Sequence, residues 1–279
     1  MGNYISVILS VLLLFGCSNN SDSDFSVEKV NEAIKKGDYS AIVLERDGIK
    51  LTEVYDIPHF EDVEVLLETE NQRFQLGSNK IEFRTNFFNI GQKTVDQDRH
   101  RVKNEVRGQY LNIIINKGLA KRQYGSFIEA DIENGDNYFL CFLCRSYNAS
   151  LKGSKTALLF NIKADENGCS SNTNVTDAIG YAIHQPSGVY NGLEQEKVLF
   201  DFYLKNVSIG DSGNYAIAKI DGTEFKITKW SPYWITGLKK GSHILEIEVF
   251  NKAGEKINSV FPNQCLSKFE LKKNPLFKE

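Results

Sequence analysis

The chain has 279 residues, a formal net charge of −3 and a pI near 5.9. Nucleic acids and anionic membrane surfaces attract basic proteins, so this charge balance argues against both as partners. The sequence contains 18 Phe and 12 Tyr but only 1 Met and 5 Pro. Because aromatic side chains fit a pleated, half-buried surface, this composition favours a folded protein rich in β-strands.

The first predicted element is an export signal. Residues 7–15 are almost wholly aliphatic, and this run is shorter than the roughly 20 apolar residues that span a bilayer. Cys17 follows directly after Leu14-Phe15-Gly16, an order typical of a bacterial lipoprotein signal that is cleaved before the cysteine. We therefore predict a signal peptide over 1–16 and acyl chains such as palmitate on Cys17. The alternative is an ordinary signal peptide in which the cysteine occurs by chance. One departure from the pattern is that residues 1–16 contain no Lys or Arg, which signal peptides usually carry near their start.

The next segments lead into the folded part. Residues 17–26 are polar and predict a flexible tether. Residues 27–40 predict a short helix, because Val27, Val30 and Ala33 have helical spacing and Gly37 ends the pattern. Ser18 after the cysteine, where Asp would retain a lipoprotein in the inner membrane, predicts transfer to the outer membrane, on its periplasmic or surface face.

From residue 41 onward, apolar and polar residues alternate with the period of a half-buried strand. Clear examples are 80–84, 198–205 and 245–249. Asn134-Gly135 and Asp221-Gly222 predict hairpin turns between such strands, and no long helical pattern interrupts them. The fold class predicted is therefore mainly β.

These strand patterns also repeat along the chain. Residues 80–91 match 197–210, and three later segments match in the same order, namely 108–113 with 213–218, 135–140 with 241–246, and 159–162 with 268–271. A period of about 110 residues is the size of an immunoglobulin-like sandwich. We therefore predict two tandem immunoglobulin-like β-sandwich domains, 41–165 and 175–275, joined by a polar linker over 166–174. Chance alternation is the alternative explanation.

Three segments of the second half carry a resemblance to a known family. They begin at Leu199 (Leu-Phe-Asp-Phe-Tyr-Leu-Lys-Asn), at Ile220 (Ile-Asp-Gly-Thr-Glu-Phe) and at Lys229 (Lys-Trp-Ser-Pro-Tyr-Trp-Ile-Thr-Gly-Leu). They resemble a family of bacterial, largely Bacteroidetes, envelope proteins often labelled phosphopeptide-binding. The first half agrees more loosely, at 89–91, 108–109 and 145–147. The resemblance implies an envelope protein.

One departure from the family bears on metal binding. Members of the family carry His-x-His after the Gly-Gln pair, and adjacent imidazoles on one strand face are a plausible metal site. This chain has Tyr110 and Asn112 at those positions. Any metal activity of relatives is therefore not expected here, and no metal or cofactor is predicted.

The four remaining cysteines offer limited chemistry. Cys141 and Cys144 lie three apart in a predicted strand, so their side chains point to opposite faces and a redox pair is not expected. We expect small buried residues, with a possible disulfide between Cys169 and Cys265 in an exported protein.

Catalytic and metal motifs are weak. His184 and Ser187 are a histidine and a hydroxyl close in sequence, but Pro-Ser-Gly is more typical of a turn. The carboxylates in 131–136 have the spacing found at the start of a calcium-binding loop, but the Glu that closes such a loop is missing. Asn134-Gly135 predicts a hairpin turn there instead. Asp56, His59, Glu61 and Asp62 are expected to be a solvated loop. An enzyme is therefore not predicted.

Two segments could carry binding. Three aromatics, Trp230, Tyr233 and Trp234, lie within five residues and cannot all face one core, so one could be a stacking platform for a sugar or peptide. Pro232 predicts that this segment is at an edge or an interruption of a sheet.

The second candidate is the long stretch 92–107, at a place where the other repeat has only a tight turn. An extended basic loop of this kind is suited to the capture of carboxylate or phosphate groups. Its candidate residues are Arg99, His100, Arg101, Lys103 and Arg107. The alternative for the aromatic segment is packing in the core, and the alternative for 92–107 is a solvated insertion.

The sequence thus predicts a lipid-anchored envelope protein that acts as a non-catalytic binding or assembly module. The expected partners are the membrane, through the lipid, and an envelope protein, peptide or glycan. The alternative is a periplasmic protein that binds a metal or a small ligand.

Overall fold

The computed structural model describes residues 41–54, 60, 62–68, 73–95, 104–173 and 175–272. This part of the chain is mainly β, and its helices are two short 3-10 turns, η2 (Gly192–Gln195) and η3 (Pro262–Gln264). None of the helices in these ranges is long and apolar enough to cross a membrane. The predicted signal peptide, Cys17, the tether and the helix over 27–40 lie outside the described residues.

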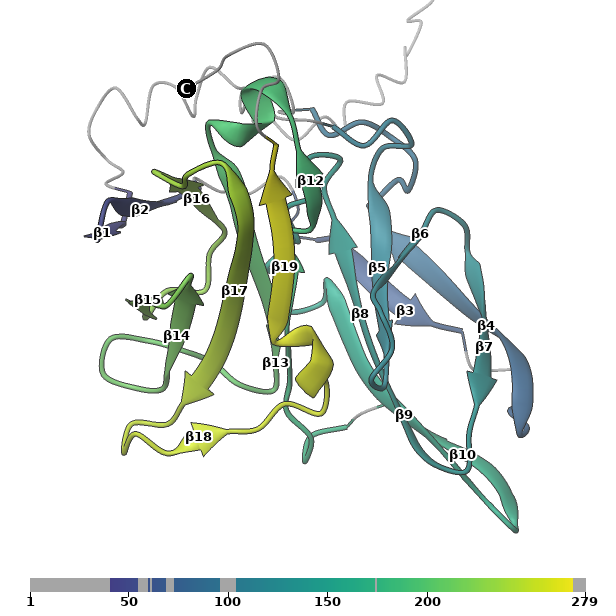
Figure 1. Ribbon diagram of the computed structural model, residues 1–279. Helices are drawn as coiled ribbons and strands as arrows, with labels where there is room; N and C mark the ends of the chain where they lie inside the picture. The colour runs from purple at the N-terminus through teal and green to yellow at the C-terminus, as the bar shows by residue number, and fades with distance from the viewer. Residues whose placement is uncertain are drawn as a thin grey trace, which may run out of the picture. The chain divides into compact units, whose positions relative to one another are not determined.

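Two sheets enclose a first core (Figure 1). One is three-stranded, in the order β3 (Glu64–Leu67), β4 (Gly77–Asn86) and β7 (Phe127–Ile132). The other is five-stranded, in the order β10 (Gly168–Asn172), β9 (Ala157–Asp165), β8 (Gly135–Cys144), β5 (Tyr110–Ile115) and β6 (Lys121–Gln123). Between the two sheets, the ring of Phe83 on β4 lies 6.4 Å from that of Phe160 on β9, and Phe160 stacks on its sheet neighbour Phe139 at 4.6 Å. We call this the first sheet pair.

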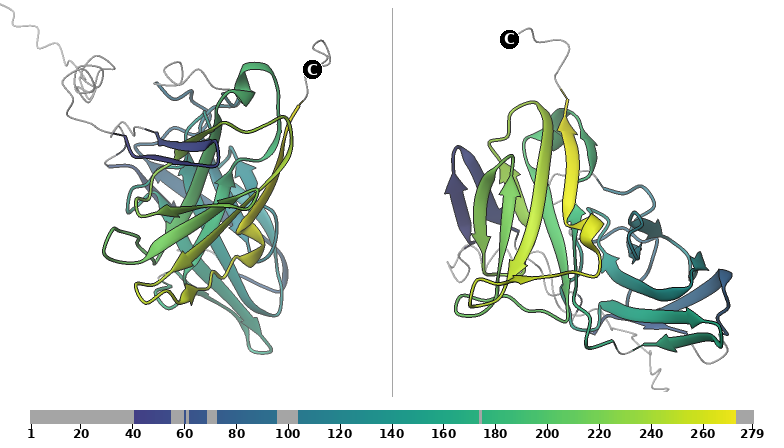
Figure 2. Two further views of the ribbon diagram at one scale, coloured as in Figure 1. Left: turned by 60° about the vertical axis from the view of Figure 1, so that its left-hand side comes forward. Right: turned by 60° about the horizontal axis from the view of Figure 1, so that its bottom comes forward.

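Two further sheets enclose a second core. One has the order β1 (Val43–Arg46), β2 (Ile49–Glu53), β16 (Tyr233–Thr236), β13 (Val198–Lys205) and β11 (Gly180–Gln185). The other has the order β12 (Gly188–Tyr190), β19 (Leu266–Leu271), β17 (Gly241–Phe250), β14 (Tyr215–Ile220) and β15 (Thr223–Ile227), with β18 (Lys256–Ile257) beside β17. This is the second sheet pair, and Figure 2 shows both pairs in two further views.

The two sheet pairs repeat one strand connectivity. The orders β3-β4-β7 and β9-β8-β5-β6 in the first pair correspond to β11-β13-β16 and β19-β17-β14-β15 in the second. The segments that match in sequence lie on corresponding strands, for example 80–83 on β4 and 197–200 at the start of β13. Each repeat therefore encodes the same order of strands around its own buried face.

The first hairpin of the described chain, β1–β2, does not belong to the domain predicted for it, which was the sandwich over 41–165. Strands β1 and β2 do not join the first sheet pair, because β2 pairs with β16, with Leu51 opposite Ile235. Leu51 is fully buried in the second core. The Glu53 carboxylate, itself buried, receives hydrogen bonds from Lys229 and Ser231 just before β16. Residues 43–53 thus belong to the second half of the fold, as Figure 1 shows.

The two sheet pairs also contact each other through a third apolar cluster. Phe142 of β8 stacks on Tyr203 of β13, with ring centroids 4.4 Å apart. Beside them, Lys152 Nζ lies 2.7 Å from Asp201 Oδ1, and the Ser150 N–H donates to Asp201 Oδ2 at 2.9 Å. The side chain of Asp201 is fully buried, and that of Lys152 is 11% exposed. This ion pair therefore links the two halves away from solvent.

The cysteines give a further correction. Cys141, Cys144, Cys169 and Cys265 are all free. Cys169 packs against the first core and Cys265 against the second, so they are held in different sheet pairs and the suggested bridge is not formed. The thiols of Cys141 and Cys144 are fully buried, and burial raises the pKa of each thiol far above its ordinary value.

Candidate binding site

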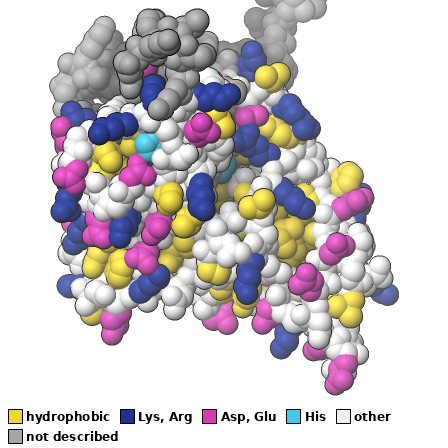
Figure 3. All heavy atoms as spheres, in the orientation of Figure 1, with side chains coloured by type: hydrophobic (Ala, Val, Ile, Leu, Met, Phe, Trp, Pro, Cys, Tyr) yellow, Lys and Arg dark blue, Asp and Glu magenta, His cyan; other side chains and the backbone are white. Residues whose placement is uncertain are grey.

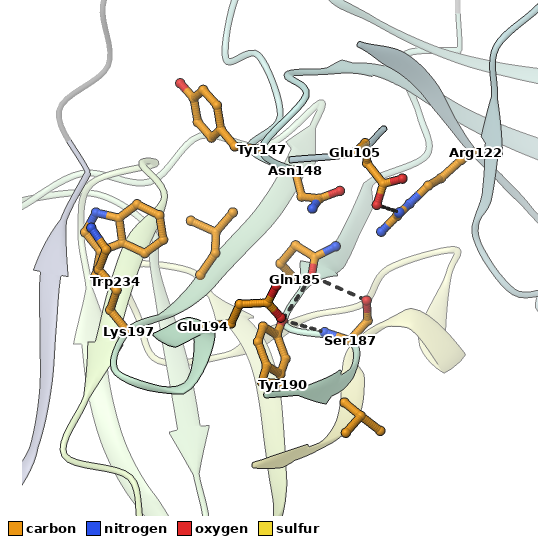
Figure 4. Close-up of a pocket in the computed structure, with 12 residues that line it drawn as sticks. Glu105, Arg122, Tyr147, Asn148, Gln185, Ser187, Tyr190, Glu194, Lys197 and Trp234 are labelled. Atoms are coloured by element: carbon orange, nitrogen blue, oxygen red, sulfur yellow. Dashed lines mark hydrogen bonds and ion pairs between the residues drawn. The ribbon is translucent and has the colours of Figure 1, made fainter. Parts of the chain in front are cut away.

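A cavity of about 230 Å³ lies where loops of the first sheet pair meet β11, β12 and η2 of the second (Figure 4). We call it the Trp234 cavity. It is lined by Glu105, Arg122, Tyr147, Asn148, Gln185, Ser187, Val189, Tyr190, Glu194, Lys197, Leu199 and Trp234. Its walls therefore combine aromatic rings, amides and paired charges from residues that lie far apart in the sequence.

The aromatic segment 230–234 divides between core and cavity. The Trp230 indole N–H donates to Phe202 O at 3.0 Å, and its ring meets Tyr203 edge-on. Tyr233 is 1% exposed and packs in the second core. Trp234 is the member that lines the cavity. It points the other way from Tyr233 because successive residues of a strand face opposite sides of the sheet.

The Trp234 ring is held from both sides. It packs partly against a small apolar cluster formed by Val54, Tyr147, Ala149 and Leu199. Lys197 Nζ lies 4.7 Å from the centroid of the ring. Of the two alternatives predicted from Pro232, the edge is wrong, because β16 has β2 on one side and β13 on the other. Pro232 instead lies in the interruption just before β16, where its carbonyl accepts a hydrogen bond from the Val54 N–H at 2.9 Å and its missing N–H removes no bond within the strand.

Gln185 is the most firmly oriented polar group in the cavity. Tyr190 and Ser187 both donate hydroxyl hydrogen bonds to Gln185 Oε1, each at 3.3 Å, and the Ser187 N–H donates to the Tyr190 hydroxyl. Burial raises the pKa of Tyr190 to about 12, so its hydroxyl stays a donor at neutral pH. Both bonds go to the oxygen, so within the described residues the Gln185 amide nitrogen keeps its N–H donors for a ligand. Gln185 is itself only 5% exposed.

Asn148 is fixed in the same manner from the other wall. It adopts a left-handed backbone conformation, φ 68°, in the turn after β8, which Asn tolerates well. The Tyr110 hydroxyl donates to Asn148 Oδ1 at 2.8 Å, so its oxygen is also engaged inside the protein. The site thus presents amide groups whose orientation is set before any ligand arrives, which lowers the entropic cost of binding.

The ends of the predicted basic loop meet at this cavity. Thr94 N–H donates to Ser146 Oγ at 3.0 Å, and Glu105 N–H donates to Ser146 O at 2.7 Å. Glu105 forms an ion pair with Arg122 in the cavity wall, and Arg107 lies over the Tyr124 ring at 4.0 Å. Among the predicted basic residues, Arg99, His100, Arg101 and Lys103 lie outside the described residues.

Charge in the cavity is balanced. Two acidic side chains, Glu105 and Glu194, and two basic ones, Arg122 and Lys197, line it. Figure 3 shows Lys, Arg, Asp and Glu side chains mixed over one face of the molecule rather than gathered by sign. A neutral ligand suits such a lining better than a polyanion, which would need uncompensated cations.

The weak catalytic and metal candidates are placed as follows. His184 Nε2 lies 3.1 Å from the Tyr110 hydroxyl and 3.4 Å from Cys144 Sγ, whereas the Ser187 hydroxyl donates to Gln185. Burial lowers the pKa of His184 to about 4. The carboxylate-rich stretch 131–136 spans the end of β7, the link between the strands and the start of β8, with Gly135 at φ 98°. These two strands lie in different sheets, so the hairpin predicted at 134–135 is not formed and the link crosses from one sheet to the other. No group of three or more possible metal ligands occurs in the described part of the chain; Asp56, His59 and Glu61 lie outside it.

Sequence reasoning found Trp234 but missed Gln185, Tyr190, Asn148 and Arg122. In this region the sequence predicts only a turn at 186–188, Pro-Ser-Gly. Amides and tyrosines are common on any surface, and no spacing in the sequence marks these four as neighbours. Their proximity arises because β11, β6 and the turn after β8 are brought together by the contact between the sheet pairs.

The comparisons with known proteins add little to this geometry. No family model matches the chain, and no curated protein matches it in sequence. Among solved structures, fibronectin(III)-like modules of Clostridium thermocellum CbhA match at 11% identity over 77% of this chain and 97% of theirs, with a TM-score of 0.27. SGBP-B of the Bacteroides ovatus mixed-linkage glucan utilization locus, solved with a heptasaccharide, matches at 12% identity over 75% and 70%, with a TM-score of 0.21.

Proposed function

We propose that this chain is a non-catalytic binding module that holds a small, neutral, hydroxyl-rich ligand in the Trp234 cavity. The observation that carries the proposal is the pairing of the Trp234 ring with the pre-oriented Gln185 amide in one cavity. A ring supplies an apolar face for stacking, and fixed amides supply hydrogen bonds that set orientation. Sugars combine an apolar ring face with hydroxyl groups, so they match both features.

The wider setting of this function comes from the sequence. We propose that each sheet pair is an immunoglobulin-like domain and that the chain is a tandem of two. We further propose that acyl chains on Cys17 hold it at the outer membrane of a bacterium, and that it belongs to the envelope family it resembles. The repeated strand connectivity supports the tandem, and the order Leu14-Phe15-Gly16-Cys17 supports the anchor.

The binding proposal is tested with the full chain carrying Cys17→Ser, which prevents acylation. A panel of soluble neutral oligosaccharides is titrated against it by calorimetry. We expect at least one series to bind, and Trp234→Ala to weaken that binding about tenfold or more, because buried aromatic anchors usually dominate such sites. Trp234→Phe keeps a ring and should recover part of the loss.

The matched control is Phe127→Ala. Phe127 is 41% exposed and has Lys80 Nζ 4.6 Å from its ring centroid, so it copies the Lys197–Trp234 arrangement outside the cavity. This variant should bind as the unchanged protein does. Equal affinities of the unchanged and Trp234→Ala proteins would contradict the proposal, provided that both unfold at the same temperature.

A further inference from the structure

A second cavity, of about 360 Å³, adjoins the first. We call it the Asn112 cavity. Side chains of both sheet pairs line it, and most of them are polar. They include Asn112, His184, Asn263, Gln264, Ser267 and Lys268. Two of its lining residues also connect the sheet pairs through hydrogen bonds, from Asn263 Nδ2 to Lys117 O at 3.0 Å and from Gln264 Nε2 to Gly118 O at 2.9 Å.

Three residues line both cavities, namely Arg122, Gln185 and Ser187. They form a shared wall, so the two cavities adjoin each other at these three side chains. Arg122 is held on this wall by its ion pair with Glu105, and its guanidinium lies 5.2 Å from the Tyr110 ring centroid. The wall is therefore built from side chains whose positions are already fixed.

Asn112 gives the second cavity an unused donor. The residue is 2% exposed, and its amide nitrogen has no hydrogen-bond partner among the described residues. On β5 it stands opposite Arg122 of β6, so both belong to the same part of the wall. A buried donor left without a partner destabilises the folded protein, and an acceptor oxygen of a ligand would remove that cost.

Size points to joint use of the two cavities. Ligand pockets usually hold about 300–1,000 Å³, and the Trp234 cavity alone falls below this range. The two together fall within it. The first offers an aromatic ring and the second mainly amides and hydroxyls, so one end of a ligand can stack while the rest forms hydrogen bonds.

We propose that the two cavities are adjoining subsites for one extended neutral oligosaccharide, with Arg122, Gln185 and Ser187 between them. This inference rests on the proposed function and adds the length of the ligand to it. A repeating chain of sugar rings offers hydroxyl acceptors at each unit, so it can reach Asn112 and Lys268 while its end unit stays at Trp234.

The test compares series of neutral oligosaccharides, from disaccharide to hexasaccharide, by calorimetry with the full Cys17→Ser chain. Affinity should rise about tenfold or more with length in the series that binds, the equivalent of about 1.4 kcal/mol. Lys268→Gln, at an exposed position, and Asn112→Leu should remove most of this rise and leave disaccharide affinity unchanged. Asn161→Leu removes another amide with one buried unpartnered atom, Oδ1, at a half-buried position outside both cavities, and this variant should keep the rise.

The outcomes separate the two proposals. Disaccharide binding that needs Trp234 but does not strengthen with length would overturn the extended site and leave the proposed function standing. A rise with length that survives both Lys268→Gln and Asn112→Leu would also overturn it. Binding of no saccharide series, or capture of peptides instead, would overturn both the ligand class and the extended site.

Discussion

The ion pair between Lys152 and Asp201 links the sheet pairs, and breaking it by changing one partner should destabilise the protein strongly. Asp201 is fully buried and accepts hydrogen bonds from the Lys152 ammonium and the Ser150 N–H. Lys152 also donates to Ser150 Oγ at 2.8 Å and lies 5.2 Å from the Trp230 ring centroid. Substitution Asp201→Asn keeps the shape of the side chain but leaves the ammonium without its counter-charge.

The magnitude follows from this burial. Removing one partner of a buried pair typically costs about 3–5 kcal/mol, because the other charge stays desolvated. Lys152 keeps a hydroxyl, a backbone carbonyl and nearby rings, so we expect Asp201→Asn to cost about 3 kcal/mol, near the lower end. Lys152→Met should cost a similar amount. The double variant should lose much less than the sum, because no uncompensated charge remains.

The assay is urea unfolding followed by circular dichroism and tryptophan fluorescence, with the slope m checked for each variant. Lys256→Met is the control, since its ion pair with Glu248 is exposed and should contribute at most about 1 kcal/mol. Additive losses in the double variant, or a loss in Asp201→Asn no larger than that of the control, would refute the reasoning. Either result would mean that the pair does not act as a unit.

Two further predictions concern stability. The pKa of His184 falls from 6.5 to about 4 on burial, so the folded state favours the neutral ring. The contribution of His184 to the free energy of unfolding should therefore be fully present above pH 6.5 and fall by about 3 kcal/mol as the pH falls to 4. Urea unfolding of His184→Gln at several pH values should show a smaller decline. An equal decline in this variant would contradict the prediction. Gly237 has φ 86°, and an added Cβ would lie 2.0 Å from Gly48 O. Gly237→Ala should lower the free energy of unfolding by at least about 2 kcal/mol. Gly222 has φ 92° and open space around its Cβ position, so Gly222→Ala should lower it by only about 1 kcal/mol. Equal losses in the two variants would rule out the clash at Gly237.

Local sequence patterns predicted much of the fold, although the hairpin predicted at 134–135 is wrong because β7 and β8 pair in different sheets. Alternation at 198–205 and 245–249 predicts strands with one buried face, and the structure forms β13 and β17 there. The order of the repeated segments also follows from local pattern, because each repeat must bury the same set of alternating residues. The hairpin turn at Asp221-Gly222 is likewise local, since both residues adopt positive φ.

The sequence by itself determined the mainly β class, the order of strands and the presence of an aromatic segment at 230–234. Tertiary structure alone decided that β1 and β2 join the second sheet pair, because pairing partners far apart in sequence leave no local mark. It also decided which aromatic lines a cavity and which amides join it. Those choices depend on the contact between the two sheet pairs, where Phe142 stacks on Tyr203 and where Gln185, Asn148 and Arg122 line one cavity.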